Sequence, residues 1–281
     1  MQTTDAFQFG RKIFFLNPSF LIKTNIIETL RKREYEAYEI DDDRHASDYL
    51  SVQEDAILYI NPGAQTSATM WLNLINTLKD GHPKATIGIF SEQLGAPLLE
   101  QLSLCNAIEG GIFQIEGDGT QTLQQLTGTL DALNAKGRRQ YVRVTCLGDA
   151  TANFMWFHNA KLFKARLFDL SIASVAILVE SEKLPYLDTT SSIPCTIQLG
   201  VNQVQMMVKP LVVKQQTAQL HCIIYLIDRN LLDVESIALI RKYVFDTLKQ
   251  QLLQHTEAFR QRQLLARRME LARKQRMQDK S

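Results

Sequence analysis

The sequence predicts an α/β domain followed by an all-β domain and a helical C-terminal segment. Its 281 residues exceed the usual size of one domain, and its 45% hydrophobic content is enough to form real cores. Short apolar runs alternate with amphipathic segments over residues 11–133, whereas residues 138–228 contain strand patterns alone. After Asp228 the apolar residues recur at helical spacing.

The first domain is expected to contain five buried strands, each followed by a helix. The expected strands are Lys12–Leu16, Tyr35–Ile40, Ala56–Asn61, Thr86–Phe90 and Gly111–Ile115. The expected helices are Ile22–Arg33, Ala46–Glu54, Met70–Leu78, Leu98–Leu104 and Thr120–Leu133. Because strands that alternate with helices over short loops are joined by right-handed crossovers, the prediction is a five-stranded parallel sheet.

The second domain is expected to be a small antiparallel barrel, which leaves few exposed strand edges. The expected strands are Tyr141–Leu147, Asn153–Phe157, Lys164–Phe168, Val175–Glu180, Cys195–Leu199, Gln203–Val213 and Ala218–Ile227. A helix should follow, with Asp233 as its N-cap and an apolar stripe that includes Ile240, Val244 and Leu252.

These patterns place the domain boundaries. We predict an α/β domain over 1–133, a polar linker over 134–137, a barrel over 138–230 and a helical segment over 231–281. From Glu257 onward the chain carries eight Arg or Lys residues against three acidic ones. This basic tail has three interpretations: a helix for self-association or partner binding, a contact for RNA or an anionic membrane, or a solvated helical end. The basic tail lacks interleaved aromatic residues, which argues against binding to nucleic acid.

Composition and motifs argue against several classes of protein function. The net charge is +1, so no overall field attracts nucleic acid or a membrane. No signal peptide and no apolar run of membrane-spanning length is present. The four cysteines are far apart and indicate buried thiols in a reducing cytoplasm. The histidines are isolated and no catalytic motif occurs, which favours a protein that is not an enzyme and holds no metal. The run Asp41-Asp42-Asp43 is expected to be a solvated loop or an N-cap.

Two short motifs carry the strongest functional signal. Arg138, Arg139 and Arg143 open the strand-rich region, and Arg139 and Arg143 are the only two of the 16 arginines that are four positions apart. Asp169-Leu-Ser171 follows near the end of a later strand. Arginine pairs with phosphate through two N–H groups and stacks on bases, while a carboxylate accepts from the N–H edge of guanine. Together these residues predict a site for an anionic ligand that contains purine bases.

The first domain resembles the receiver domain of two-component systems in topology. The resemblance places Asn17-Pro18 where an acidic pair is usual and Asn61 where the phospho-accepting aspartate is usual. Ser91 matches the family's hydroxyl residue, but no lysine occurs near Gln114–Gly117. A domain without these carboxylates is expected to bind partners and not to accept a phosphoryl group.

The second domain resembles the PilZ family over roughly residues 137–250. PilZ domains carry an RxxxR motif and a later [D/N]xSxxG motif, which correspond here to Arg139–Arg143 and to Asp169–Ser174. The sequence departs from the second motif at Ser174, where glycine is usual. Many PilZ domains bind cyclic di-GMP, so the resemblance implies a ligand site formed by Arg138, Arg139, Arg143, Asp169, Ser171 and Ser174.

The sequence therefore predicts a cytoplasmic cyclic di-GMP effector that needs no other cofactor. Ligand binding would change the orientation of the domains and the contact with an unidentified protein partner, with an output in motility or virulence control. The alternative is a degenerate scaffold in which neither domain binds nucleotide and the C-terminal helix drives assembly. The arginines and Asp169 separate the two hypotheses, because a scaffold does not need them.

Overall fold

The computed structural model describes residues 10–62, 67–115, 117, 119–158, 161–183 and 189–278. The chain divides into two compact units, Met1–Gln140 together with Gln251–Ser281, and Tyr141–Gln250. The first unit is α/β, and the second is built from antiparallel strands.

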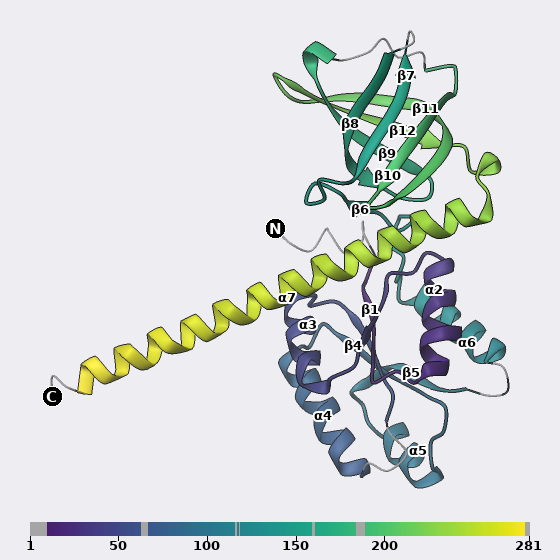
Figure 1. Cartoon of the computed structure of the whole chain (residues 1–281). Helices are drawn as coiled ribbons and strands as arrows, with labels where there is room; N and C mark the ends of the chain where they lie inside the picture. Colours follow the sequence, from purple (N-terminus) through teal and green to yellow (C-terminus); the bar gives the residue numbers. More distant parts are fainter. Residues whose placement is uncertain are drawn as a thin grey trace. The chain divides into compact units, whose positions relative to one another are not determined.

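The first unit contains a five-stranded parallel sheet with the order β2-β1-β3-β4-β5 (Figure 1). This strand order is that of flavodoxin-like doubly wound folds. The strands are β1 (Ile13–Leu16), β2 (Ala37–Ile40), β3 (Ile57–Ile60), β4 (Thr86–Ser91) and β5 (Ile108–Gln114). The helices are η1 (Ile22–Ile27), α2 (Glu28–Lys32), η2 (Asp43–His45), α3 (Ala46–Val52), α4 (Ala68–Gly81), α5 (Ala96–Ser103) and α6 (Thr120–Ala132). The predicted parallel sheet is confirmed.

Helices cover both faces of this sheet, which explains why its central strands are apolar throughout. Every residue of β1, β3 and β4 is buried. Helices η1, α2 and α6 pack on one face, and α3 and α4 lie on the other (Figure 1). Aromatic rings fill the first face, where the centroids of Phe15 and Tyr59 are 5.4 Å apart. The predicted helix at Ile22 begins as a π-helix before it continues as α2.

The segment 134–137 packs against the first unit. The N–H of Ala135 donates to the carbonyl of Leu130, which ends α6, and Ala135 is buried. The carbonyl of Ala135 accepts from the N–H of Arg11 at 2.8 Å. Lys136 Nζ lies 4.3 Å from the ring centroid of Tyr35. The residues predicted as a linker therefore have fixed contacts with this unit.

The second unit is a closed barrel of six antiparallel strands, with a short seventh strand added at one edge. The ring runs β8-β7-β10-β11-β12-β9 and closes through the pairing of β8 with β9, while β6 pairs with the end of β8 (Figure 1). The strands are β6 (Val144–Thr145), β7 (Asn153–His158), β8 (Lys161–Leu170), β9 (Ser174–Glu180), β10 (Ile193–Leu199), β11 (Asn202–Thr217) and β12 (Leu220–Ile227). The predicted barrel is confirmed, although only two residues of the strand expected over Tyr141–Leu147 are paired.

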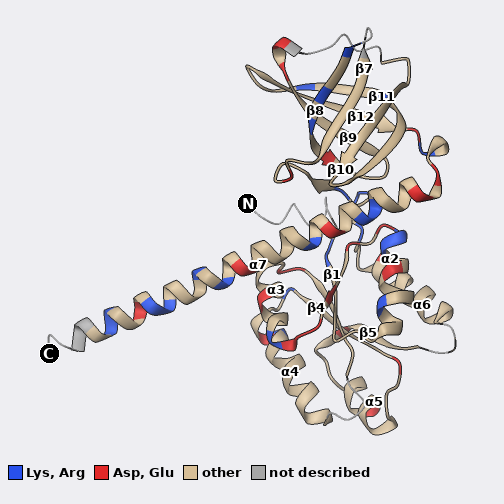
Figure 2. Ribbon diagram, in the orientation of Figure 1, with Lys and Arg blue, Asp and Glu red and all other residues tan. Residues whose placement is uncertain are grey.

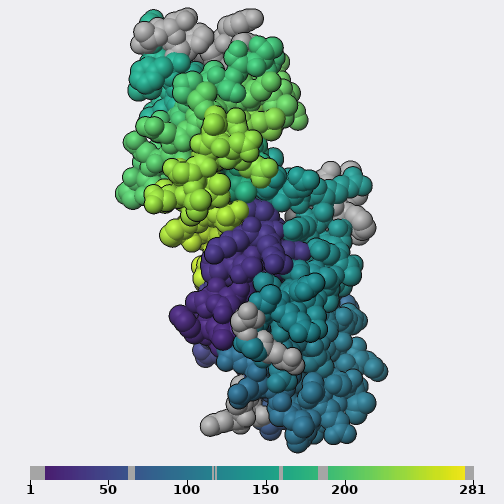
Figure 3. Space-filling view, turned by 90° about the vertical axis from the view of Figure 1, so that its right-hand side faces the viewer, coloured from purple at the N-terminus to yellow at the C-terminus, as the bar shows by residue number. Residues whose placement is uncertain are grey.

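The first turns of α7 (Val234–Gln278) complete the barrel core. Inside the barrel, the rings of Phe154 and Tyr225 stack with centroids 5.1 Å apart. Ile240 and Val244 of α7 belong to the same cluster of buried side chains, and Figure 3 shows the yellow-green start of the helix against the green strands. Asp233 Oδ1 accepts a hydrogen bond from the N–H of Ser236 at 2.6 Å, which confirms Asp233 as the cap.

The later part of α7 belongs to the first unit. Leu252 and Thr256 are buried, and Arg260 donates to Asp48 Oδ2 from Nε at 3.1 Å and from Nη2 at 2.8 Å. From residue 261 to residue 275 every side chain is exposed, including Leu264 and Leu265. Lys and Arg recur along this stretch (Figure 2). The basic tail is thus helical, and its apolar side chains are unpacked in the described part of the chain.

Two smaller predictions can be checked against the structure. Asp42 caps the short helix η2, since its side chain accepts from the N–H of Arg44. Three of the four cysteines are buried, and Cys105 is half-buried. Burial raises the pKa of the Cys146 and Cys195 thiols to about 12, which keeps both protonated and unreactive near neutral pH.

Candidate functional site

Strand register brings Arg143, the last residue of the first motif, to the second motif at one end of the barrel. Strand β6 runs antiparallel to the end of β8, with Val144 opposite Leu170 and Thr145 opposite Asp169. Arg143 directly precedes β6, so its backbone reaches the level of Ser171 in the turn that joins β8 to β9. The pairing thereby places Arg143 beside the Asp-x-Ser segment, although Asp169 lies 26 residues further along the chain.

Arg143 contacts Asp169 and Ser174. Its Nη2 donates a hydrogen bond to Ser174 Oγ at 3.2 Å, and its Nε lies 3.3 Å from Asp169 Oδ1. That Nε is buried and has no acceptor in hydrogen-bond geometry within the described part of the chain. The side chains of Arg143 and Asp169 keep 35% and 23% of their surface exposed, so a ligand can reach both.

Ser171 holds the turn between β8 and β9. Its Oγ accepts from the N–H of Ser174 at 3.0 Å and from the N–H of Ala173 at 3.3 Å. Its own N–H donates to the carbonyl of Ser174 at 2.9 Å. Only 1% of Ser171 is exposed. In this structure its hydroxyl therefore orders the turn that presents Asp169 and Ser174.

Ser174, at the position where the motif usually has glycine, is accommodated without backbone strain. It begins β9 and is absent from the non-glycine residues with positive φ, which are Asn17, Glu34 and Asn134 among those described. Its Oγ lies 3.1 Å from Ser171 Oγ in addition to accepting from Arg143. The hydroxyl that serine adds at this position thus links Arg143 to the turn.

The other two predicted arginines fall in the other unit. Arg138 and Arg139 lie within Met1–Gln140, and both side chains are exposed. Arg143, Asp169, Ser171 and Ser174 lie within Tyr141–Gln250. The structure therefore brings together four of the six predicted residues within one unit.

A further pair of side chains, Tyr141 and Arg229, lies beside this cluster and was not predicted from the sequence. The guanidinium carbon of Arg229 lies 4.7 Å from the ring centroid of Tyr141. Tyr141 stands between the two motif arginines, and Arg229 follows the last barrel strand, β12. The position of Tyr141 between Arg139 and Arg143 could have indicated a role at the site, whereas no sequence pattern around Arg229 indicates one.

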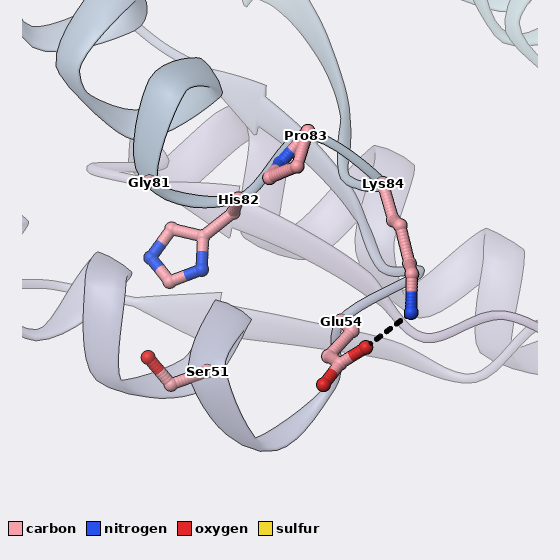
Figure 4. Close-up of a pocket in the computed structure, with 6 residues that line it drawn as sticks. All are labelled: Ser51, Glu54, Gly81, His82, Pro83 and Lys84. Carbon is pink, nitrogen blue, oxygen red and sulfur yellow. Dashed lines mark hydrogen bonds and ion pairs between the residues drawn. The ribbon is translucent and has the colours of Figure 1, made fainter. Parts of the chain in front are cut away.

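Two other pockets differ from this cluster in chemistry. A pocket of about 340 Å³ lies in the first unit, lined by Ser51, Glu54, Gly81, His82, Pro83 and Lys84 (Figure 4). Its polar groups pair with one another or with near neighbours: Lys84 binds Glu54 at 2.6 Å, and His82 Nε2 lies 2.9 Å from Ser47 Oγ. A groove of about 660 Å³ lies along β7, β10 and β11, and Met155 and Met207 are among the residues that line it.

The chain has no match among family models, and none of the curated proteins matches it. Part of the chain is similar in fold to solved structures. YcgR in complex with c-di-GMP, from Escherichia coli, matches at 12% identity and a TM-score of 0.36, over 44% of this chain and 51% of that chain. The PilZ domain of YcgR with c-di-GMP matches at 12% identity and 0.34, over 43% of this chain and 98% of that one. The Bacillus subtilis inhibitor of motility MotI/DgrA matches at 15% identity and 0.33, over 41% of this chain.

The chain spans about half the length of two of these structures, 51% of YcgR and 52% of MotI/DgrA. Within the described ranges, no helix has the length and hydrophobicity needed to cross a bilayer. No group of three His, Cys, Asp or Glu side chains is placed to hold a metal ion in the part of the chain that the structure describes.

Proposed function

We propose that the barrel unit binds cyclic di-GMP at Arg143, Asp169 and the Ser171–Ser174 turn, and that the chain acts as an effector of this second messenger. The observation that carries the proposal is the contact of Arg143 with both Asp169 and Ser174 at the end of the barrel. A cation and a carboxylate stand side by side there, each partly exposed. A cyclic dinucleotide carries phosphates and guanine edges that these two groups can bind.

Each side chain then has a defined role. Arg143 turns its guanidinium from Ser174 to a phosphate or to the O6 and N7 edge of guanine, and its Nε–H, which makes no hydrogen bond in the described part of the chain, gains an acceptor. Asp169 accepts from the N1–H and N2–H groups of guanine. Ser171 keeps the turn in place. Ser174 either contacts the ligand or loses its hydrogen bond with Arg143 when the ligand binds that arginine. No metal or further cofactor takes part in this binding.

Arg138 and Arg139 complete the site in the proposal. Both side chains are exposed, and an arginine can pair with a phosphate or stack on a base. Because they belong to the other compact unit, a ligand that engages all three arginines would alter the relation between the units. A change of this kind is a switch that a protein partner can read. Self-association through the exposed apolar side chains of α7 is a further route to such an output.

The experiment is isothermal titration of cyclic di-GMP into the full chain and into two variants. Arg143→Ala should weaken binding by at least about 10-fold, because hydrogen bonds to charged groups contribute roughly 1.5–3 kcal/mol. Lys164→Ala is the matched control, since it removes a positive charge from an exposed position on β8, the strand that carries Asp169. It should bind as the parent does.

Three outcomes bear on the proposal. The proposal is supported if the parent binds, Arg143→Ala binds at least about 10-fold more weakly, and Lys164→Ala binds as the parent does. Equal weakening in both variants would indicate a general charge effect and refute the assigned site. A folded parent that does not bind would overturn the receptor hypothesis in favour of a degenerate scaffold, in which Arg143, Asp169 and Ser174 only stabilise the end of the barrel.

A further inference from the structure

Arg229 and Tyr141 form a cation–π pair at the end of the last barrel strand. Arg229 opens the short helix η4 (Arg229–Leu231), two residues after the end of β12, and its side chain is exposed. Its guanidinium carbon lies 4.7 Å from the centroid of the Tyr141 ring, within the range of a cation–π contact. Tyr141 is half-buried and packs against the barrel core, so it is a fixed support for the arginine.

Backbone pairing places both members of this pair next to the Arg143 cluster. The N–H of Ile227, two residues before Arg229, donates to the carbonyl of Ala173 at 2.9 Å. Leu226 stands opposite Ser174 in the pairing of β12 with β9. Tyr141 precedes Arg143 by two residues, which is roughly 7 Å of extended chain. All of these residues lie within the unit Tyr141–Gln250.

The charge of Arg229 is not used elsewhere in the described part of the chain. Its guanidinium makes no ion pair there, and the carboxylate of the neighbouring Asp228 accepts from the N–H of Asn230 instead. The guanidinium contacts the Tyr141 ring, while the Arg229 side chain remains exposed to solvent. A planar cation that is supported by one aromatic ring and still exposed can stack on an aromatic base.

We propose that Arg229, supported by Tyr141, stacks on a purine base of the nucleotide bound at Arg143 and Asp169. The inference rests on the proposed function and adds a contact outside both motifs. The two sets of groups would then contact different parts of the ligand. Arg143 and Asp169 recognise polar edges and phosphate, and Arg229 contributes a flat cationic surface that favours a large aromatic base.

The test measures cyclic di-GMP affinity of the full chain in four variants. Arg229→Ala removes the stack, and Arg229→Lys keeps the charge but loses the planar group. Both should weaken binding by about 5- to 150-fold, the range of base stacking on one side chain. Tyr141→Ala removes the ring that supports Arg229 and should weaken binding as well, whereas the charge control Lys164→Ala should bind as the parent does. Thermal unfolding confirms that each variant is folded.

The outcomes separate this inference from the proposed function. Parent-like binding by Arg229→Ala, together with loss in Arg143→Ala, overturns the stacking contact and leaves the receptor proposal intact. Parent-like binding by Arg229→Lys means that charge alone acts at this position, which also overturns the stack. If the parent does not bind, the proposed function fails and this inference fails with it.

Discussion

Replacing Ser174 with glycine tests how the ligand-free site is held. Ser174 is buried, and its hydroxyl accepts from Arg143 at 3.2 Å and lies 3.1 Å from Ser171 Oγ. A hydrogen bond to a charged group contributes roughly 1.5–3 kcal/mol, and because Arg143 is partly exposed we take about 1–2 kcal/mol for its loss. A glycine in a strand adds roughly 0.5–1 kcal/mol of backbone entropy. We therefore expect Ser174→Gly to lower the free energy of unfolding of the barrel by about 1.5–3 kcal/mol.

The same change should strengthen ligand binding. In the parent, a bound phosphate must compete with Ser174 for the Arg143 guanidinium, so loss of that internal bond raises the free energy of the ligand-free state alone. A difference of about 1 kcal/mol corresponds to roughly 5-fold tighter binding of cyclic di-GMP. Ser174→Ala, which removes the hydroxyl but keeps Cβ, should give the same gain in affinity with a smaller loss of stability.

Urea unfolding followed by tryptophan fluorescence measures the stability term. The chain has two tryptophans, and Trp156 lies in the barrel core. A Trp71→Phe background removes the signal of the α/β unit, so the fluorescence reports the barrel alone. Titration calorimetry in the same background measures affinity. The reasoning is refuted if Ser174→Gly leaves the stability of the barrel unchanged, or if stability and affinity fall together.

Two further predictions concern stability. A Cβ at Gly88 would lie 2.6 Å from Cε1 of Tyr59, so Gly88→Ala should destabilise the α/β unit by about 1–3 kcal/mol. Gly128 is in an open helical position, so Gly128→Ala should stabilise the same unit by roughly 0.5–1 kcal/mol. Equal effects of the two variants in urea unfolding would contradict the packing argument. Burial opposes ionisation of Asp149, but hydrogen bonds from its own turn and from Tyr243 hold its pKa below the usual value. This carboxylate therefore stabilises the fold above its unfolded pKa of about 3.9, and the contribution is lost as pH falls through the lower folded pKa. Tyr243→Phe should raise that folded pKa and reduce the stability lost on acidification; an unchanged profile of stability against pH would argue against the hydrogen bond.

Local patterns predicted most of the elements, because side-chain periodicity along the chain depends on neighbours that are close in sequence. The strands from Asn153 onward agree with the structure to within a few residues. The expected strand over Tyr141–Leu147 is the clearest difference, since only Val144 and Thr145 are paired. Whether an apolar segment pairs depends on the edge available to it, and here β6 meets only the end of β8.

The sequence by itself determined the two classes of domain, the helical C-terminus and the residues of both motifs. Only the tertiary structure decided which of those residues meet. Closure of the barrel and the register of β6 on β8 bring Arg143 to Asp169 and Ser174, and the end of β12 brings Arg229 onto Tyr141. These contacts join positions between 26 and 88 residues apart, from Arg143–Asp169 to Tyr141–Arg229. Periodicity carries no information over such separations, because the pairing of distant strands is set by the packing of the whole core.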